Sequence, residues 1–192
     1  MSALRPENLP KLDLPTDAEL DARTAGFLES LPRMNVWRMI ARTGVVREYQ
    51  AVLAVMFGPD WIPGADREVI ALRTFRQNAS DYEIPQHFVL AESAGIPREA
   101  TRAVLDDQLD RLEPWFRQLC HMVDSMSGRA KLTEEQVGEL VSHYGSQDKA
   151  AQAIMTMAWF HMLTRFVDST GVPADEGPDA YAGLSTPAGK GQ

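Results

Sequence analysis

Apolar residues recur at helical spacing along most of the chain, and this periodicity predicts helices almost throughout. The clearest example is residues 44–57, where one face gathers several apolar side chains: Val45, Tyr49, Val52, Leu53 and Met56. Residues 66–77 form the next expected helix, and its acidic first turn suits the positive end of the helix dipole. No alternation typical of a strand, no hairpin signal and no internal repeat stands out. The pattern therefore predicts an all-α fold.

Capping residues predict where several helices begin. Thr16 or Asp17 can cap the first helix, and Asn35 can cap a short second one. Thr133, followed three residues later by Gln136, fits a capping box, in which each side chain bonds the backbone of the other residue.

Glycine and proline predict where other helices end. Gly95 and Gly145 lie where a left-handed residue commonly closes a helix. Residues 98–112 and 115–126 are expected to form two helices divided by Pro114, because proline does not fit a helix interior.

The chain of 192 residues suits one domain with a sizeable core. Residues 1–16, with three prolines and little periodicity, predict an extended N-terminal arm. Residues 17–173 are expected to form a single all-helical domain. Residues 174–192, rich in Gly, Pro, Ala and Ser, predict a flexible C-terminal tail.

Composition narrows the class of protein. Because 27 acidic residues outnumber 19 basic ones, the net charge of −8 disfavours nucleic acid, which needs a clustered basic face. No apolar run is long enough for a transmembrane helix, and the N-terminal residues lack the apolar core of a secretory signal. The single cysteine, Cys120, excludes an internal disulfide and a Cys-x-x-Cys pair. We therefore expect a cytoplasmic protein with no membrane partner.

The segment NASDYEIPQH, residues 78–87, joins two expected helices and concentrates polar groups. Ser80, Glu83 and His87 lie at i, i+3 and i+7, on one stripe of a helix. Glu68 shares a stripe with apolar residues of the preceding helix, which predicts that it faces inward. Two antiparallel helices joined by a short turn can bring Glu68 opposite Glu83 and His87. Two carboxylates and an imidazole in a partly buried pocket suit proton transfer near neutral pH.

Pro85 complicates this alignment, because its ring excludes an ordinary interior helix position. Either the second helix begins near Pro85, so that Glu83 lies at its cap and can point elsewhere, or the first helical turn is distorted. Two other interpretations stay open: Glu83 and His87 can form a surface pair, or together with Glu68 they can bind a metal ion. The Glu-x-x-His motif of di-iron bundles, repeated on two helices, is absent, so a metal ion is not expected.

Residues 66–100, DREVIALRTFRQNASDYEIPQHFVLAESAGIPREA, resemble the core of the carboxymuconolactone decarboxylase superfamily, which includes the alkylhydroperoxidase D-type proteins. The resembling features are a Glu that opens one helix, a Tyr-Glu pair at the turn, a His four residues after that Glu, and the following A…AGI. A weaker resemblance extends over residues 35–58 and 132–173, and so over most of the chain. It implies the helical bundle of that superfamily and a homo-oligomer, whether dimer, trimer or hexamer.

The peroxidase branch of the superfamily is known for a Glu, then Cys-x-x-Cys, then His. In this sequence Glu68 and His87 match the Glu and the His, whereas Ser80 and Glu83 occupy the two cysteine positions. Peroxide reduction by that route needs a thiolate and a resolving thiol. The resemblance therefore implies a branch without the cysteine pair, and alkylhydroperoxidase or peroxiredoxin-type antioxidant activity is the disfavoured alternative.

The decarboxylase branch uses no cysteine pair. The resemblance to it implies a lyase- or decarboxylase-like enzyme that performs cofactor-independent acid–base chemistry, as decarboxylation, isomerisation or elimination, on a small carboxylated or enolisable metabolite. In that picture His87 is the main proton donor or acceptor, Glu68 orients it, and Glu83, Tyr82 and Ser80 assist. The dedicated lactone decarboxylases are shorter and lack this Ser-Asp-Tyr-Glu turn, which leaves the substrate open.

Other polar residues have two interpretations each. An anionic substrate would need a cation, and Arg73 or Arg76 could supply it, although each can equally be a solvated surface residue. His161, Arg165 and Asp168 recur along the last expected helix, where they can reach the pocket or form a polar seam at a subunit contact, which we favour. A non-catalytic protein that binds a small molecule or a partner protein is the second alternative function.

Overall fold

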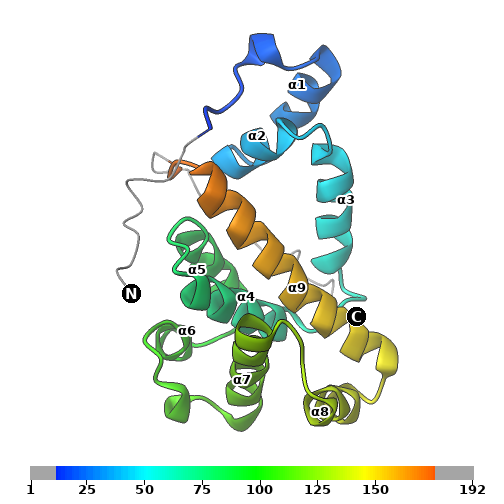
Figure 1. Ribbon diagram of the computed structural model, residues 1–192, viewed down its shortest axis with the longest axis vertical. Helices are drawn as coiled ribbons and strands as arrows, with labels where there is room; N and C mark the ends of the chain where they lie inside the picture. Colours follow the sequence, from blue (N-terminus) through cyan, green and yellow to red (C-terminus); the bar gives the residue numbers. More distant parts are fainter. Residues whose placement is uncertain (1–11, 176–192) are drawn as a thin grey trace.

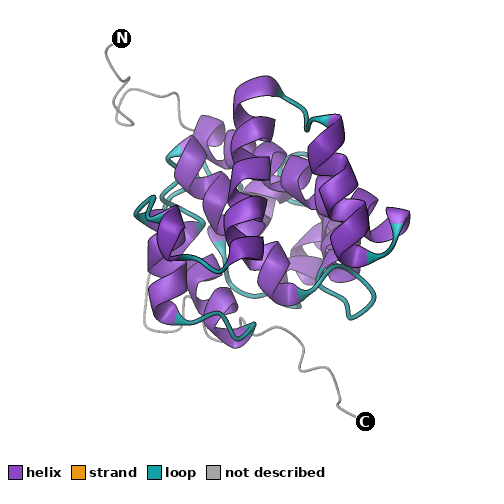
Figure 2. Cartoon of the chain, turned by 90° about the horizontal axis from the view of Figure 1, so that it is seen from below, coloured by secondary structure: helices purple, strands orange, loops and turns teal. Residues whose placement is uncertain are grey.

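The computed structural model describes residues 12–175, and these form an all-helical protein, as predicted. No strand occurs in this range (Figure 2). Two short 3-10 turns lie at Asp17–Glu19 and Leu109–Arg111. The helices are α1 (Ala22–Glu29), α2 (Asn35–Ala41), α3 (Val46–Met56), α4 (Gly64–Asn78), α5 (Ile84–Ser93), α6 (Arg98–Leu105), α7 (Pro114–Arg129), α8 (Glu134–Tyr144) and α9 (Gln147–Thr170).

The predicted terminal segments fall largely outside the described residues, which exclude 1–11 and 176–192. Where they are described, both ends are held by the helical domain. The backbone N–H of Leu12 donates to the carbonyl of Thr170, and Asp175 bonds residues near the start of α2 and α5. None of the described helices is long and apolar enough to cross a membrane.

Helices α4 and α9 form the centre of the fold. They pack against each other, and α4 also contacts α5, α6 and α7. Figure 1 shows α9 crossing the molecule diagonally, with α1, α2 and α3 toward one end and α6, α7 and α8 toward the other. Because neighbours surround α4, residues 66–75 are all buried, including several that are polar or charged. Those polar groups must find partners inside the protein.

Helix α3 lies beside α9 and joins α2 through aromatic contacts. The ring centroid of Tyr49 on α3 lies 4.8 Å from that of Trp159 on α9 and 6.0 Å from that of Trp37 on α2. The predicted apolar face of residues 44–57 is only partly buried. Val45, just before the helix, is 50% exposed, whereas Tyr49 and Leu53 line a cavity described below.

Several predicted helix ends agree with the structure. Thr133 and Gln136 form the expected capping box, and α8 ends at Gly145 with a φ of 64°, a conformation that suits glycine. Asn35 is not a cap, contrary to the prediction: Met34 precedes α2, and the backbone N–H of Asn35 donates to Asp175 Oδ1 (2.6 Å). A contact with Asp175, 140 residues along the chain, thus takes the place of the local cap expected from the Asn35 side chain.

Two predicted helices are shorter than expected. The first is divided into a 3-10 turn and α1, because Asp21 caps α1 by accepting the backbone N–H of Thr24 (2.9 Å). The helix predicted over 98–112 stops at Leu105. Asp107 then takes a positive φ of 61°, and its carboxylate binds Arg73 of α4 (2.7 Å). The prediction was wrong here: the backbone leaves the helical conformation at Asp106 and Asp107, and a short 3-10 turn at Leu109–Arg111 replaces the rest of the expected helix.

Candidate functional site

The turn between α4 and α5 settles the question raised by Pro85. Helix α5 begins at Ile84, so Pro85 lies in the first helical turn, where its missing N–H costs no hydrogen bond. The first alternative is therefore correct: the helix begins near Pro85 and Glu83 is the capping residue. Glu83 nevertheless stays buried, and the backbone N–H of His87 donates to its carbonyl (3.0 Å).

The structure brings Glu68 and His87 together. His87 Nδ1 lies 2.7 Å from Glu68 Oε2, and both side chains are buried. The other carboxylate oxygen, Oε1, accepts a hydrogen bond from Arg67 Nε (2.9 Å). Because a carboxylate only accepts hydrogen bonds, the hydrogen of a neutral His87 ring lies on Nδ1, and Nε2 keeps its lone pair.

Arg67 is the residue of this group that the pattern of the sequence did not indicate. It is 1% exposed, and its Nη2 has no hydrogen-bond partner among the described residues. Its guanidinium carbon lies 3.9 Å from the ring centroid of Phe57, and this cation–π contact covers the charge. The only signal in the sequence was that Arg67 directly precedes Glu68. The burial of this helix on every side became visible only in the fold. Arg67 and Glu68 thus form a buried ion pair behind His87.

Aromatic rings fix the orientation of the His87 imidazole. The ring centroids of Phe75 and Phe160 lie 4.7 Å and 5.3 Å from that of His87, both in edge-on arrangements. With Nδ1 bound to Glu68, the ring has little freedom to rotate. Such support from packing and from the hydrogen bond to Glu68 keeps a reactive group in one geometry.

Glu83, Ser80 and Asp168 form a second polar group next to His87. Ser80 Oγ lies 2.5 Å from Glu83 Oε2 and 2.8 Å from Asp168 Oδ1. Burial raises the pKa of Glu83 to about 7; the negative charge of Asp168 adds to this increase, while the Ser80 hydrogen bond and His87 oppose it. At neutral pH Glu83 is therefore present both as the acid and as the carboxylate.

His87 and Glu83 both line a cavity of about 430 Å³ between α2, α3, α5 and α9. Most of its wall is apolar, with contributions from Ile40, Leu53 and Phe160. No arginine or lysine occurs among the described residues that line it. The helices that contribute to its wall can be followed in Figure 1. This volume lies in the range of small-molecule sites.

Tyr82 lines the cavity, but its hydroxyl is already engaged. The hydroxyl accepts the backbone N–H of Val36 (3.0 Å) and donates to Asp175 Oδ2 (2.7 Å). Burial and the Asp175 carboxylate raise the pKa of Tyr82 well above its usual value. The side chain is thus placed to shape the cavity wall rather than to exchange a proton.

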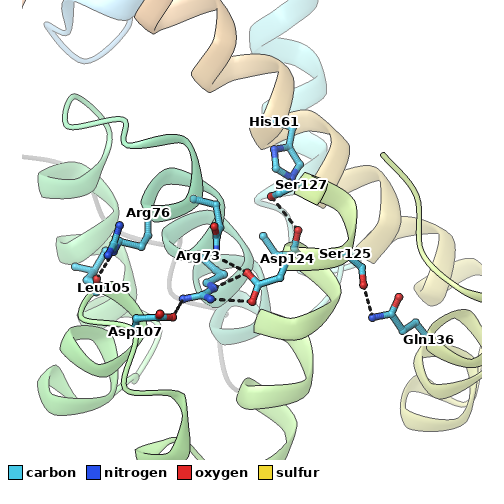
Figure 3. A network of polar contacts seen from close by, with 11 residues as sticks. Arg73, Arg76, Leu105, Asp107, Asp124, Ser125, Ser127, Gln136 and His161 are labelled. Atoms are coloured by element: carbon cyan, nitrogen blue, oxygen red, sulfur yellow. Dashed lines mark hydrogen bonds and ion pairs between the residues drawn. The ribbon is translucent and has the colours of Figure 1, made fainter. Parts of the chain in front are cut away.

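The two arginines expected to bind an anionic substrate are used elsewhere, as Figure 3 shows for Arg73 and its neighbours. Arg73 makes a bidentate pair with Asp124 of α7 (2.8 and 2.7 Å) and a further ion pair with Asp107 (2.7 Å). Arg76 donates from Nε to the carbonyl of Leu105 (2.7 Å). Neither arginine lines the cavity. Their geometry supports a structural role, joining α4 to α7 and to the end of α6.

Arg73→Lys is expected to lower the free energy of unfolding by about 2 kcal/mol, because an ammonium group cannot reproduce the bidentate pair. Urea unfolding of the variant and the wild type measures the difference. Ligand binding in the cavity is expected to stay unchanged. Equal stability of the two proteins would contradict the structural role.

His161 does not lie on an exposed seam, contrary to the preferred interpretation. It is 3% exposed, and its ring nitrogens lie 3.2 Å from Asn78 Nδ2 and 3.3 Å from Ser127 Oγ. Burial and the nearby Arg165 lower the pKa of His161, which favours the neutral ring. Asp168, on the same stripe, is half-buried and contacts Ser80 Oγ, and Arg165 is exposed.

Metal and thiol chemistry were the remaining possibilities for this site. Among residues 12–175, no group of three or more His, Cys, Asp or Glu side chains is placed to hold a metal ion. Cys120 is fully buried on α7, and burial raises its pKa to about 12. It therefore lacks the thiolate character that a peroxide-reducing cysteine needs.

The sequence matches no protein-family model, and a search of curated proteins finds no match. Solved structures, in contrast, share the fold. An uncharacterized peroxidase-related protein from Silicibacter sp. TM1040 superposes with a TM-score of 0.74 at 16% identity, over 94% of this chain and 98% of that one. A second, the alkylhydroperoxidase AhpD core of an uncharacterized peroxidase-related protein from Ralstonia eutropha JMP134, gives 0.72 at 17% identity, over 89% and 94%.

These similarities cover almost the whole of both chains, so they establish an AhpD-like helical fold for this protein. The predicted fold class is thereby confirmed. At 16% and 17% identity, however, a shared fold does not transfer an activity. The function depends on the side chains that line the cavity.

Proposed function

We propose that this protein is a cofactor-independent acid–base enzyme that acts on a small organic molecule bound in the cavity. The observation that carries the proposal is the pair of titratable side chains, His87 and Glu83, in the wall of an otherwise largely apolar cavity. Paired groups with different environments are typical of sites that remove a proton at one position and return it at another.

His87 is suited to act as the base. Its Nδ1 hydrogen is held by Glu68, so Nε2 has the free lone pair. When Nε2 takes a proton from a substrate carbon, the imidazolium that forms lies 2.7 Å from the Glu68 carboxylate, which stabilises the new charge. Arg67 holds the opposite oxygen of Glu68 and keeps that carboxylate in place.

Glu83 is suited to act as the acid. With a pKa raised to about 7 it is partly protonated at neutral pH, and it can donate to an oxygen or carbon of the substrate. Isomerisation uses both proton transfers, removal by His87 and donation by Glu83. Decarboxylation or elimination uses the same two groups, with loss of carbon dioxide or water. In this scheme neither Ser80 nor Tyr82 exchanges a proton directly with the substrate.

The lining of the cavity favours a substrate with a small, largely apolar body and few charges. Because no arginine or lysine is found among the described lining residues, a strongly anionic molecule would enter without a counter-charge. A neutral enolisable ketone, lactone or related carbonyl compound fits this lining better. We therefore favour the enolisable class over the carboxylated one.

Hydrogen–deuterium exchange of substrate C–H bonds tests the proposal. A panel of neutral cyclic ketones and lactones is incubated with the protein in D₂O, and loss of the α-proton signal is followed by NMR. We expect at least one compound to exchange faster than in buffer, and His87→Gln to slow this exchange by about 100-fold or more. His121→Gln, which changes an exposed histidine outside the cavity, is the control and is expected to exchange at the wild-type rate.

Two results would contradict this function. If His87→Gln exchanged as fast as the wild type, His87 would not be the base. If compounds bound in the cavity, shown by ligand-observed NMR, but none exchanged, the non-catalytic binding alternative would replace the enzyme. Antioxidant activity of the Cys-x-x-Cys type stays disfavoured because the sequence contains a single cysteine. The predicted homo-oligomer is a further proposal, which light scattering can test.

A further inference from the structure

The hydrogen-bond pattern around Ser80 cannot be satisfied by ionised carboxylates alone. Ser80 Oγ is within hydrogen-bonding distance of Glu83 Oε2 (2.5 Å) and of Asp168 Oδ1 (2.8 Å). A serine hydroxyl has one hydrogen, so it donates to one of these oxygens only. The second short contact needs another hydrogen, because two oxygens with only lone pairs facing each other repel. A proton on one of the two carboxyl groups supplies that hydrogen.

The three side chains also connect two different environments. Glu83 is 2% exposed and lines the cavity, and its Oε1 has no hydrogen-bond partner among the described residues. Ser80 is fully buried between the two acids. Asp168, near the end of α9, is only half-buried and therefore reaches solvent. The order from cavity to surface is Glu83, Ser80, Asp168.

We propose that Glu83, Ser80 and Asp168 share one proton and form a path that carries it between the cavity and the surface. The proposal rests on the acid–base function given above and adds Asp168, which lies outside the cavity wall, as the residue that reloads Glu83. Its direct evidence is the two short contacts of one hydroxyl, which a proton shared by the two acids satisfies.

Each proton in the path is accounted for. When the Glu83 acid donates its one proton to a substrate, both carboxyl groups are ionised, and the Asp168 carboxylate takes a proton from solvent. The Asp168 acid then gives this proton to Ser80 Oγ, while the Ser80 hydroxyl gives its hydrogen to Glu83 Oε2, so that Glu83 is again the acid and Asp168 the carboxylate. No bond other than O–H bonds forms or breaks within the path, and no oxidant or reductant is needed.

The neighbouring charges agree with a shared proton. Burial raises the pKa of both acids, and the Asp168 carboxylate increases that of Glu83. Asp81 has the same effect on Asp168. His87 lowers the pKa of Glu83, while Tyr49, across the cavity on α3, is neutral because burial raises its own pKa. The negative neighbours and the burial together favour a single proton held by the pair.

Carbon-13 NMR of the labelled protein tests the path without requiring any substrate. The side-chain carboxyl signals of Glu83 and Asp168 are assigned by their loss in Glu83→Gln and Asp168→Asn. Their chemical shifts are then followed from weakly acidic to weakly alkaline pH. In the wild type we expect Glu83 to titrate with a midpoint near 7.

The variants are expected to move this midpoint in opposite directions. Asp168→Asn removes the negative neighbour and leaves the Ser80 hydrogen free for Glu83, so the midpoint should fall by about one pH unit. Ser80→Ala removes that hydrogen bond, so the midpoint should rise. Asp110→Asn, at an exposed aspartate on another part of the chain, is the matched control and should leave the midpoint unchanged.

The path is overturned if Glu83 titrates near 4.5, or if Asp168→Asn leaves its midpoint where it was. Asp168 is half-buried near the end of a long helix, so we expect Asp168→Asn to fold. This variant therefore tests the path even if Ser80→Ala fails to fold. If Glu83 titrates as expected but His87→Gln exchanges substrate protons as fast as the wild type, the proposed enzyme function is refuted and the shared proton is kept. If His87→Gln slows the exchange but the Glu83 midpoint does not behave as expected, only the proton path is refuted.

Discussion

Glu68→Gln is expected to lower the free energy of unfolding by about 3–5 kcal/mol, the largest effect on stability that we predict for a single substitution. Glu68 and Arg67 are 0% and 1% exposed, and their ion pair spans 2.9 Å. Removing only the carboxylate charge leaves the guanidinium buried without a counter-charge. Guanidinium chloride unfolding, followed by circular dichroism, measures the change.

Two control variants separate charge burial from loss of shape. The double variant Arg67→Met/Glu68→Leu removes both charges and keeps most of the volume, so it should recover much of the lost stability. Glu92→Gln breaks the exposed ion pair with Arg98 (2.6 Å) and should change stability little, because water and salt screen that pair. Equal losses in Glu68→Gln and in the double variant would refute the charge argument.

Glu83→Gln is expected to increase stability at alkaline pH by about 3 kcal/mol, following the conversion of about 1.4 kcal/mol per pKa unit. Burial raises the pKa of Glu83 from 4.5 to about 7 in the folded protein. The folded state thus binds a proton that the unfolded state has already released between these two pH values. Glutamine resembles the protonated acid and does not ionise, so the variant avoids the cost of a buried carboxylate.

The sign of this effect follows from proton linkage. Between pH 4.5 and about 7 the folded protein binds more protons than the unfolded chain, so its stability falls as pH rises through this window. Below 4.5 Glu83 is protonated in both states and this contribution is fully present. Glu83→Gln should flatten this part of the curve, leaving the smaller slope contributed by Asp168 and other groups. An unchanged pH dependence of urea unfolding would show that Glu83 is not perturbed.

The local part of the site was predictable from the sequence. Glu68 and His87 lie on helices joined by a short turn, and apolar neighbours on the Glu68 stripe indicated that it faces inward. Both conditions depend on helix periodicity and on a turn of a few residues, which the chain specifies locally. The structure indeed joins the two side chains by a 2.7 Å contact.

The non-local part of the site was not predictable in the same way. Asp168 meets Ser80 across 88 residues of sequence, and nothing near either residue indicates this contact. Arg73 looked free to bind an anion, but Asp124, 51 residues away, had the matching geometry. Electrostatic partners of this kind are chosen by helix packing, so a pattern of charges along one helix does not reveal them.

The sequence alone determined that this chain is all-helical, that it lacks the cysteine pair of a disulfide-cycling peroxidase, and that an acid and an imidazole flank one turn. These features depend on residue identity and on short-range periodicity. Only the tertiary structure decided that His87 and Glu83 share an apolar cavity, that Arg67 supports Glu68, and that Ser80 contacts both Glu83 and Asp168. Burial and neighbouring charge set the behaviour of these groups, and both come from helices that meet only when the chain is folded.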